Sequence, residues 1–543
     1  MLFSFELMAQ TEDLVESISN TAEQSTANET LELGDISYDV LENPIDINQA
    51  SADELLQCGL FSLQQVSEIM EHRTKFGNLL SLHELQVLDG FGVSDILRVR
   101  PYVTIGQGVY MPIGGISRLL QEGRQQLISR IQFVPETKAG YDSRYGSPTY
   151  EGSPAAVYLR YRFDAANRIR WGFTAEKDPG EPLFKGSRKD GFDFYSMHLH
   201  LRDFGRFKTI ALGDFRLSYG QGLVFSGGGR GIPSDPCLML TAGTGIRPYT
   251  SAGETGFFRG AATSISISKK ITADIFFSHA KRDANVMVGS DSTSIFTSLQ
   301  SSGLHRTWYE IADRKRVRER MFGAALRFST SRIKWDVITS FTGYNRDFSK
   351  TFQYYNQFDF KGRSNPMVGL NTHVPFRNIN LFAEAAMDGR FNKGIVAGLV
   401  TMLGTQAGMV MMVRDYEVGF YNPHGGAFGA SYRNSAEHGL LFGINCKPSK
   451  PWNLSFSADR FQFKWLRYGV SAPSSGNRVE FNISYKPDRK NDLAVRWRKS
   501  VRMEDGASEG KTLLYPERRS ESGIRLQLIS TVSKSITLRT RVE

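Results

Sequence analysis

Cysteine is almost absent from this chain, and the three that occur, Cys58, Cys237 and Cys446, lie far apart. They provide neither a disulfide framework nor a CxxC metal-ligand pair. The nine histidines form no HExxH motif, and no residue pattern announces a catalytic triad. We therefore expect no catalytic residues, no metal site and no cofactor, and we do not expect an enzyme.

Proline is also scarce, with 19 residues against 52 glycines, 37 phenylalanines and 21 tyrosines. Aromatic residues make up 12% of the chain, which argues against disorder. The mean hydropathy is nevertheless −0.31. Many aromatics and glycines at moderate polarity suit a large antiparallel β structure with one apolar and one polar face.

Basic residues are missing from the first 72 positions, which hold fifteen Asp or Glu. Residues 73–105 carry a net charge of +1, so the overall +10 leaves +24 for residues 106–543. A basic body behind an acidic leader favours anionic partners such as lipid head groups, nucleic acid or polysaccharide. The alternative is a basic surface that is simply solvated.

The chain begins with a short apolar stretch, residues 1–9 (MLFSFELMA), which is similar to the end of a secretory signal peptide. A basic n-region is missing, so an ordinary disordered N-terminus is the alternative. Residues 10–43 are acidic and rich in Ser, Thr and Asn, as expected of a disordered linker.

Residues 44–105 have the apolar periodicity of a small helical domain. Ser51 with Glu54, and Ser81 with Glu84, have the spacing of capping boxes at two helix starts. The Gly90-Phe91-Gly92 turn then leads into a further helix that ends before Pro101.

This stretch resembles the tandem helix-hairpin-helix domain of ComEA-type DNA receptors. The resemblance is carried by IDINQAS at 45–51, by His72-Arg73 with Phe76-Gly77, by the Gly90 to Gly92 hairpin and by Pro101-Tyr102-Val103. It implies that backbone N–H groups at a helix N-terminus bind DNA phosphates without reading the bases. The residues implicated are Gly90, Phe91, Gly92, Val93, Ser94, Lys75, Arg98 and Arg100.

The first hairpin of this domain departs from the family's pattern, because Gln57-Cys58-Gly59-Leu60-Phe61 lacks the expected proline and second glycine. Only the second hairpin is intact. The domain also holds eight acidic and four basic side chains, which is unfavourable for binding driven by counterion release. The alternative is a compact module that docks on a protein.

The rest of the chain, after a connector at 106–126, alternates apolar and polar residues with a period of two. This pattern predicts about nineteen strands, mostly of the length that a tilted strand needs to cross a bilayer. Short turns and long loops alternate between them, as in outer-membrane barrels. The strands are expected near 127–133, 155–163, 168–176, 194–202, 207–214, 257–268, 271–280, 321–329, 333–341, 366–373, 378–388, 394–402, 405–414, 437–446, 452–462, 477–485, 491–499, 520–529 and 534–542.

We therefore expect a mainly β chain whose residues 127–543 form a transmembrane antiparallel barrel, with the helical domain on its periplasmic side. An odd strand count is unusual in a bacterial barrel. It predicts either a missing C-terminal strand or a miscount by one. The apolar run 394–413 could be a transmembrane helix, but Gly404-Thr405-Gln406 favours two strands joined by a turn.

The arrangement resembles outer-membrane proteins of Bacteroidetes-type bacteria with an N-terminal helix-hairpin-helix domain and a C-terminal barrel. Gly213-Asp214-Phe215 with Gly220-Gln221-Gly222-Leu223 is similar to one of their recurring stretches. Residues 226–231 (SGGGRG) are not followed by the Lys-Ser/Thr of a P-loop. We interpret them as an external loop, or as one that folds inward to form a constriction.

Two functions remain open. In the first, the periplasmic domain captures or guides double-stranded DNA, and a basic lumen lined by Arg160, Arg162, Arg168, Arg170, Arg496 and Arg498 favours a polyanion. In the second, the barrel is an anchor or pore embedded in outer-membrane lipid, and the helical domain binds a periplasmic protein or plugs the barrel.

Overall fold

The computed structural model describes residues 45–543 with gaps, and the structural statements below concern these residues. The gaps are 49, 51–54, 56–59, 62, 89, 93–94, 97–98, 106–119, 122, 143, 145–149, 166–167, 227–231, 233–234, 240–242, 244, 289–293, 331–332, 377, 405, 450, 489, 507–514 and 534–535. The signal-like stretch, the acidic linker, Ser51 and Cys58 lie outside the described residues.

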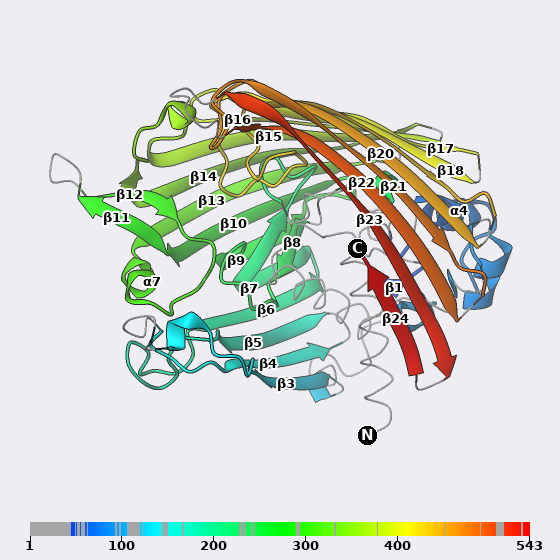
Figure 1. Cartoon of the computed structure of the whole chain (residues 1–543). Helices are drawn as coiled ribbons and strands as arrows, with labels where there is room; N and C mark the ends of the chain where they lie inside the picture. Colours follow the sequence, from blue (N-terminus) through cyan, green and yellow to red (C-terminus); the bar gives the residue numbers. More distant parts are fainter. Residues whose placement is uncertain are drawn as a thin grey trace.

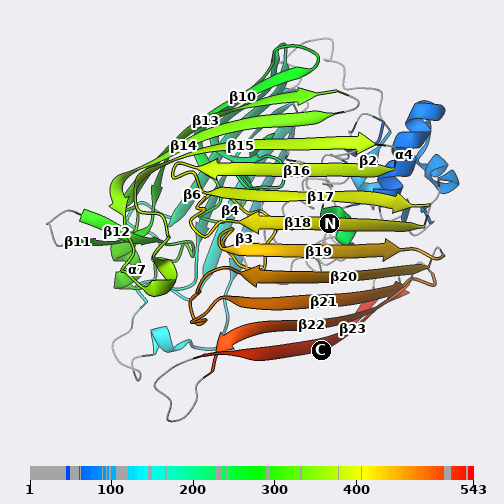
Figure 2. The same ribbon diagram turned by 90° about the horizontal axis from the view of Figure 1, so that it is seen from above.

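The main body is a closed antiparallel β-barrel that runs in sequence order from β3 to β24 (Figures 1 and 2). Its first half comprises β3 (Arg124–Gln132), β4 (Ala156–Ala165), β5 (Ile169–Lys177), β6 (Phe194–Phe204), β7 (Phe207–Ser218), β8 (Gly245–Pro248), β9 (Phe258–Ser266), β10 (Ile271–Arg282), β11 (Ala284–Val288), β12 (Ser294–Leu299) and β13 (Val317–Ser329). Its second half comprises β14 (Lys334–Phe348), β15 (Gly362–Phe376), β16 (Ile379–Asp388), β17 (Lys393–Leu403), β18 (Ala407–Tyr416), β19 (Glu437–Cys446), β20 (Trp452–Phe463), β21 (Ser474–Tyr485), β22 (Asn491–Asp505), β23 (Pro516–Ser533) and β24 (Ile536–Val542).

Each strand expected from the two-residue alternation is present, and the mainly β prediction is confirmed. The sequence pattern missed β8, β11 and β12. These three are only four to six residues long, too short for alternation to stand out. β11 and β12 form a hairpin beyond the wall (Figure 1), next to the short helix α7 (Trp308–Asp313). The remaining one-turn helices are η3 (Ala139–Tyr141), η5 (Pro236–Met239) and η6 (Tyr354–Asn356).

The two ends of the barrel differ in the length of their connections. Turns such as 205–206 and 267–270 lie at one end, while long segments such as 178–193, 349–361 and 417–436 lie at the other. In the order of the ring, β24 is followed by β3, and among the described residues the registers pair β24 with β23 and β3 with β4. Both strands begin at the short-turn end, so the two strands at this seam run in the same direction.

The ladder registers identify which residues share the inner face. Gly369 faces Val224, a residue of the long connection inside the barrel, and pairs with Ala386 in the ladder. The same face carries Glu384, Val396 and Arg414 on the following strands. The opposite face exposes apolar side chains on nearly every strand. Examples are Ile275, Phe277, Phe322, Leu370, Ile395, Val413, Leu440 and Leu526.

Residues 394–413 form the two strands β17 and β18, so the hairpin prediction for this apolar run is confirmed. Among the described residues, no helix is both long and apolar enough to cross a bilayer. The hairpin is apolar on both faces because its inner residues Val396, Val400, Val410 and Met412 are buried in the main hydrophobic core.

That core lies inside the barrel, and it corrects the expectation of a uniformly polar, water-filled interior. Inner-face residues such as Phe276, Met321 and Leu441 pack with Leu223, Phe225 and Cys237 of the long connection. Side chains still point alternately inward and outward along these strands, but both the inner and the outer set are largely apolar. The interior along β7 to β19 is therefore a packed protein core rather than a wetted wall.

One buried ion network accompanies this core. The Arg414 guanidinium donates to Glu437 at 2.6 Å and to both oxygens of Asp459, and none of the three side chains is exposed. Glu437 also accepts the backbone N–H groups of Ala430 and Ser431. Every charge here is paired, which a buried ion requires, and the network attaches connection 417–436 to the wall.

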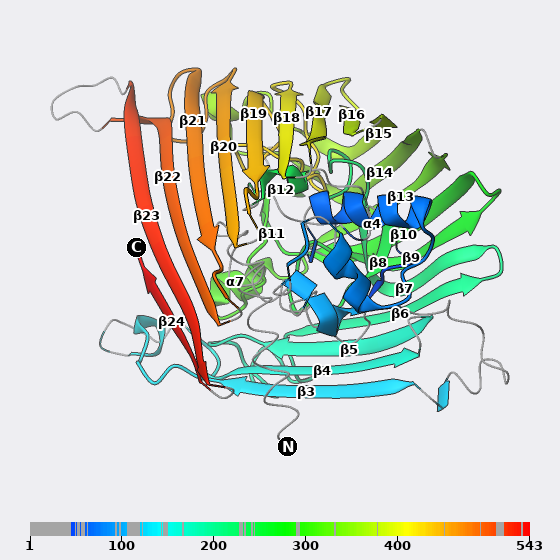
Figure 3. The ribbon, with the colours of Figure 1, turned by 90° about the vertical axis from the view of Figure 1, so that its right-hand side faces the viewer.

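The segment before the barrel has a hydrophobic core of its own, which includes Leu55, Ile69, Leu85 and Phe91. It contains β1 (Ile45–Asp46), α4 (Leu63–Lys75), η1 (Leu82–Val87), η2 (Arg100–Tyr102) and β2 (Val103–Thr104), with β1 parallel to β2. We call residues 45–105 the helical segment. It lies at the short-turn end, where α4 contacts β18, and in Figure 3 it lies across the opening of the barrel.

The second expected capping box differs in detail. Ser81 caps η1, a 3-10 helix, by accepting the N–H of His83 rather than that of Glu84. Glu84 accepts the N–H of Leu80. The N-cap serine still accepts an otherwise unpaired backbone N–H at the start of the helix. The helix that follows is a short 3-10 helix instead of the expected α-helix.

Candidate functional site within the barrel lumen

The long connection after β7 enters the barrel, and we call residues 219–226 the inward segment. Its backbone N–H groups at Gln221, Leu223 and Val224 all donate to the carboxylate of Glu384 on β16. Glu384 and Leu223 are fully buried. A carboxylate that accepts several backbone N–H groups makes strong, charge-assisted hydrogen bonds, so this side chain anchors the segment to the wall.

The connection 417–436 holds the inward segment from its other side. The Asn422 side chain donates to the carbonyls of Leu223 and Val224, each at 2.7 Å. Gly426 N–H donates to the Gly222 carbonyl at 2.9 Å. Both hydrogen-bonding sides of the inward segment are thus satisfied without water, as buried backbone requires.

Glycine is needed where this segment turns. Gly220 has a φ of +52°, and a Cβ there would lie 2.7 Å from a Glu384 oxygen and 2.8 Å from Asn371. Gly222 has a φ of +89°. The Gly-Gln-Gly stretch noted in the sequence therefore serves to bring its backbone against a carboxylate.

Glu384 was missed in the sequence, although a signal was present. It is the only charged residue between Asn380 and Met387 in an otherwise apolar strand (NLFAEAAM). An isolated carboxylate on an apolar strand requires a partner, but the partner is about 160 residues away along the chain, and only folding identifies it.

The inner face from β21 through the seam to β5 is rich in arginine, and we call this surface the arginine strip. The ladder registers show that its members share the inner face. Arg496, for example, lies opposite Arg525, and Arg162 lies opposite the inward-facing Gly172. The strip comprises Arg478, Arg496, Arg498, Arg525, Arg539, Arg541, Arg124, Arg130, Arg160, Arg162 and Arg170.

Five of the six arginines expected to line the lumen lie in this strip. Arg160 and Arg162 are buried, and Arg170 pairs with Asp164 at 2.6 Å. Arg496 pairs with Glu480 at 2.9 Å, and Arg498 is exposed. Arg168 lies in the turn before β5, where it donates to the Asp203 carbonyl.

Near β23, the described residues leave space beside the strip, whereas Arg160 and Arg162 on β4 are buried. A Cβ added to Gly523, which lies opposite Arg498 in the ladder, would meet no atom within 4 Å. At Gly408 and Gly443, by contrast, it would meet Cys237 and Pro236 of the long connection. The inner face is therefore packed against the long connection at Gly408 and Gly443, whereas at Gly523 it meets no other described residue.

The hairpin glycines of the helical segment are engaged within the segment. Gly92 N–H donates to the Asp95 carboxylate at 2.9 Å, and the Gly90 carbonyl accepts the Gln65 side chain. Phe91 is buried, and Lys75 pairs with Glu71 on the exposed side of α4. Arg100 is exposed. Val93, Ser94 and Arg98 lie outside the described residues.

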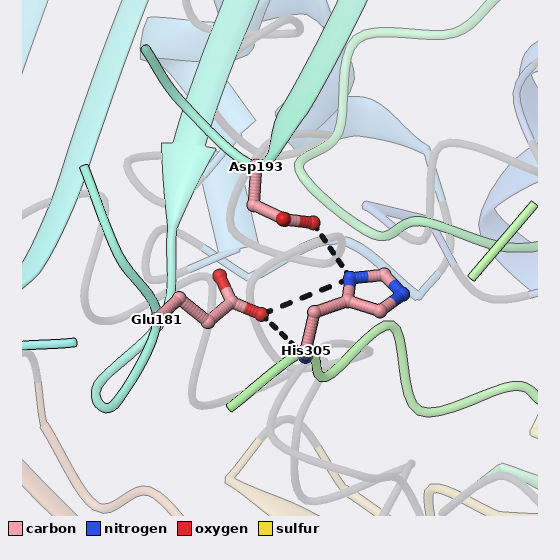
Figure 4. A group of neighbouring side chains, drawn as sticks. All are labelled: Glu181, Asp193 and His305. Carbon is pink, nitrogen blue, oxygen red and sulfur yellow. Dashed lines mark hydrogen bonds and ion pairs between the residues drawn. The ribbon is translucent and has the colours of Figure 1, made fainter. Parts of the chain in front are cut away.

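A second cluster of charged residues lies at the long-loop end, around His305 (Figure 4). The imidazole nitrogens lie 2.7 Å from Asp193 and 2.9 Å from Asp283, and Glu181 accepts the backbone N–H of His305. Burial lowers the pKa of His305, but the hydrogen bonds and charges of the two aspartates outweigh it and raise the pKa to about 10. Burial, aided by the charge of Asp193, raises the pKa of Glu181 to about 7.

Glu181, Asp193 and His305 are close enough together to hold a metal ion, and so are Glu254, Asp283 and His305. Both imidazole nitrogens, however, already face carboxylates, and a raised pKa keeps the ring protonated. A protonated histidine cannot act as a metal ligand. The cluster is better described as a cation between two anions, which joins connection 178–193 to the excursion 283–316 between β10 and β13.

No family model and no curated protein matches the chain. Solved structures similar to it include OpdQ of Pseudomonas aeruginosa, with 11% identity, a TM-score of 0.37, and coverage of 78% of this chain and 99% of that one. The outer membrane protein OprD of Pseudomonas aeruginosa has 9% identity, a TM-score of 0.35, and coverage of 72% and 88%. An anion-selective porin from Comamonas acidovorans has 10% identity, a TM-score of 0.29, and coverage of 78% and 100%. Likeness at this level carries no argument about function.

Replacing Glu384 with alanine should free the inward segment. The N–H groups of Gln221, Leu223 and Val224 lose their acceptor, so their amide hydrogens should exchange at least about tenfold faster. Hydrogen exchange read by mass spectrometry would measure this. Glu480→Ala is the matched control, because Glu480 bonds Arg496 and Asn482 rather than the segment. Unchanged exchange in Glu384→Ala would show that Glu384 is not the anchor.

The His305 cluster should become less stabilising as the pH rises. A histidine whose pKa is raised on folding stabilises the fold fully below its ordinary pKa near 6.5 and loses this contribution as the pH approaches about 10. The difference in unfolding temperature between the wild type and His305→Gln should therefore shrink from pH 6.5 to 10. A difference independent of pH would contradict the assignment.

Proposed function

We propose that this chain is an outer-membrane channel that favours anions, with half of its lumen closed by the inward segment. The observation that carries the proposal is the arginine strip on the inner face of the barrel, in which Arg130 and Arg498 are exposed. Because water does not fully screen charges in a confined pore, a cationic wall raises the local concentration of anions.

Membrane location is supported by the outer face of the barrel. Large apolar side chains such as Phe322, Leu370 and Leu526 are about half exposed there. Aromatic pairs, Phe328 with Trp335 and Trp452 with Tyr485, lie near the short turns. An apolar band bounded by aromatic residues is typical of barrels in lipid, whereas a water-soluble barrel would not expose so large an apolar surface.

Acidic side chains also lie beside the arginine strip, but they do not cancel its charge. Asp164 and Glu480 are each paired with one arginine of the strip, while Arg498 and Arg130 are exposed. The excess positive charge predicted from the sequence thus includes side chains that a passing anion would meet. The narrowing by the inward segment favours small solutes over bulky ones.

Reversal-potential measurements in planar bilayers with a KCl gradient test the selectivity. The wild-type channel should pass chloride in preference to potassium, and Arg130→Glu with Arg498→Glu should lower that preference severalfold. The matched control is Lys269→Glu with Lys270→Glu, which makes the same charge change in the turn between β9 and β10. A closed or cation-selective wild type, or a lumen variant equal to the control, would overturn the proposal.

The two finer hypotheses from the sequence concern the helical segment. Protein docking or plugging is supported by its contact with β18 and its place across the barrel opening (Figure 3). DNA binding rests on the resemblance alone, and the N–H group of Gly92 that it would use is already bonded to Asp95. We therefore favour the former.

Duplex DNA titrated onto the full chain at low and moderate salt separates these two. If the hairpin bound phosphates, Gly90→Ala with Gly92→Ala would weaken binding while Gly77→Ala, another glycine with positive φ, would not. We expect the two variants to behave alike. A specific loss in the hairpin variant would establish the DNA hypothesis instead.

A further inference from the structure

The outer face of the barrel carries a group of cations that the channel function does not use. Lys281 on β10 lies opposite Arg318 on β13, and His279 lies opposite Arg320 in the next outward-facing row. Lys281, Arg318 and Arg320 are exposed. Within the described part of the chain, none of the three forms an ion pair with a carboxylate.

Lys281 and Arg318 border a hollow of about 580 Å³ at the long-loop end of the wall, and Arg320 lies in the next row on the same face. Its lining contains no acidic residue and consists of Lys281, Lys315, Arg316, Arg318, Asn345 and Arg346. The Asn345 side chain accepts the backbone N–H of Arg318 at 2.7 Å, which ties β14 to β13 at the rim. The hollow is therefore a cationic site held by three adjacent strands.

Unpaired charge is not general on this face. Arg259, for example, donates to both oxygens of Asp214. Like charges gathered without partners repel one another. The cluster at Lys281, Arg318 and Arg320 is thus a local arrangement suited to an external anion rather than a consequence of the overall positive charge.

The surface next to these cations is apolar and aromatic. Phe277 lies opposite Phe322, and Phe322 stacks on Phe341 of β14 with ring centroids 5.0 Å apart. Ile275 extends the same surface toward the short turns and is half exposed. A ligand on this wall would therefore meet cations at one end and hydrocarbon-compatible rings at the other.

The position along the strand matches a membrane boundary. Arg318 lies about ten residues from Phe328, whose ring packs against Trp335 at the short-turn end, and about ten residues is the length of a transmembrane strand. If the Phe328–Trp335 pair marks one interface, Lys281 and Arg318 mark the other. Arginine binds phosphate through two parallel N–H groups, and basic pockets at interfaces hold anionic head groups.

We propose that this hollow binds the phosphorylated head group of a lipid in the leaflet at the long-loop side, with the acyl chains lying over Phe277, Phe322 and Phe341. The proposal goes beyond the channel function and rests on it only for the membrane location of the barrel.

The test uses the purified full chain in neutral detergent and native mass spectrometry. The probes are lipid A with two phosphates, the same lipid without phosphates, and inorganic phosphate. The wild type should retain the bisphosphorylated lipid selectively. Lys281→Gln with Arg318→Gln and Arg320→Gln should weaken its binding about a hundredfold, since each cation near a membrane surface contributes about fivefold.

The matched control removes the same charge at the short-turn end, through Lys208→Gln, Lys269→Gln and Lys270→Gln, and should bind as the wild type does. Heat-dependent mobility in SDS gels confirms that each variant is folded. Equal binding of the two lipids, equal loss in both triple variants, or inorganic phosphate that competes as well as the lipid would each overturn the proposal. Lipid binding is measured in detergent and anion conduction in planar bilayers, so the two proposals are tested separately. Either one can be contradicted while the other is supported.

Discussion

The arrangement depends on one interaction, the Glu384 carboxylate with the backbone N–H groups of the inward segment. A closed sheet of this many strands encloses more volume than its own side chains can fill. Any polar backbone that enters such a space must find partners there or remain hydrated. Glu384 supplies those partners at the wall, and Asn422 supplies them from the second inward connection.

The inner face of the barrel differs in composition between the strands that contact the inward segment and the strands that do not. Along β7 to β19, the wall faces protein, and large apolar residues such as Phe276 and Leu441 fill the interface. From β21 through β24 and on from β3 to β5, arginines take the place of these apolar residues on the inner face. Side chains alternate between the inner and the outer face on all of these strands. What differs between the two groups of strands is which residue types occupy the inner face.

The charged residues also differ in how deeply they are buried. Arg414, Glu437 and Asp459 are fully buried and paired, which makes them structural. The His305 cluster joins two connections at the long-loop end, where a protonated ring between two carboxylates holds them together. Arg130 and Arg498 of the arginine strip and the outward cations near Lys281 are exposed, so the functional proposals rest on these two surfaces.

Much of the fold could be predicted from residue order, because alternation with a period of two is a local property. The expected strands and the β17–β18 hairpin all followed from it. It also placed Arg160 and Arg162 on one face, and the ladder registers then showed which arginines of distant strands share that face. The local residue pattern, however, predicts only that the two faces of a strand differ. It does not predict whether a face contacts lipid, water or another part of the protein.

The content of the lumen was decided by the tertiary structure. The sequence by itself determined a long barrel-forming chain with a basic body and a helical segment before it, since composition, charge and period are written in local residue order. It could not show that residues 219–226 turn inward to a carboxylate on β16, or that Lys281, Arg318 and Arg320 meet in one patch. Those contacts join residues tens to about 160 positions apart, and only the closed ring of ladders brings them within reach.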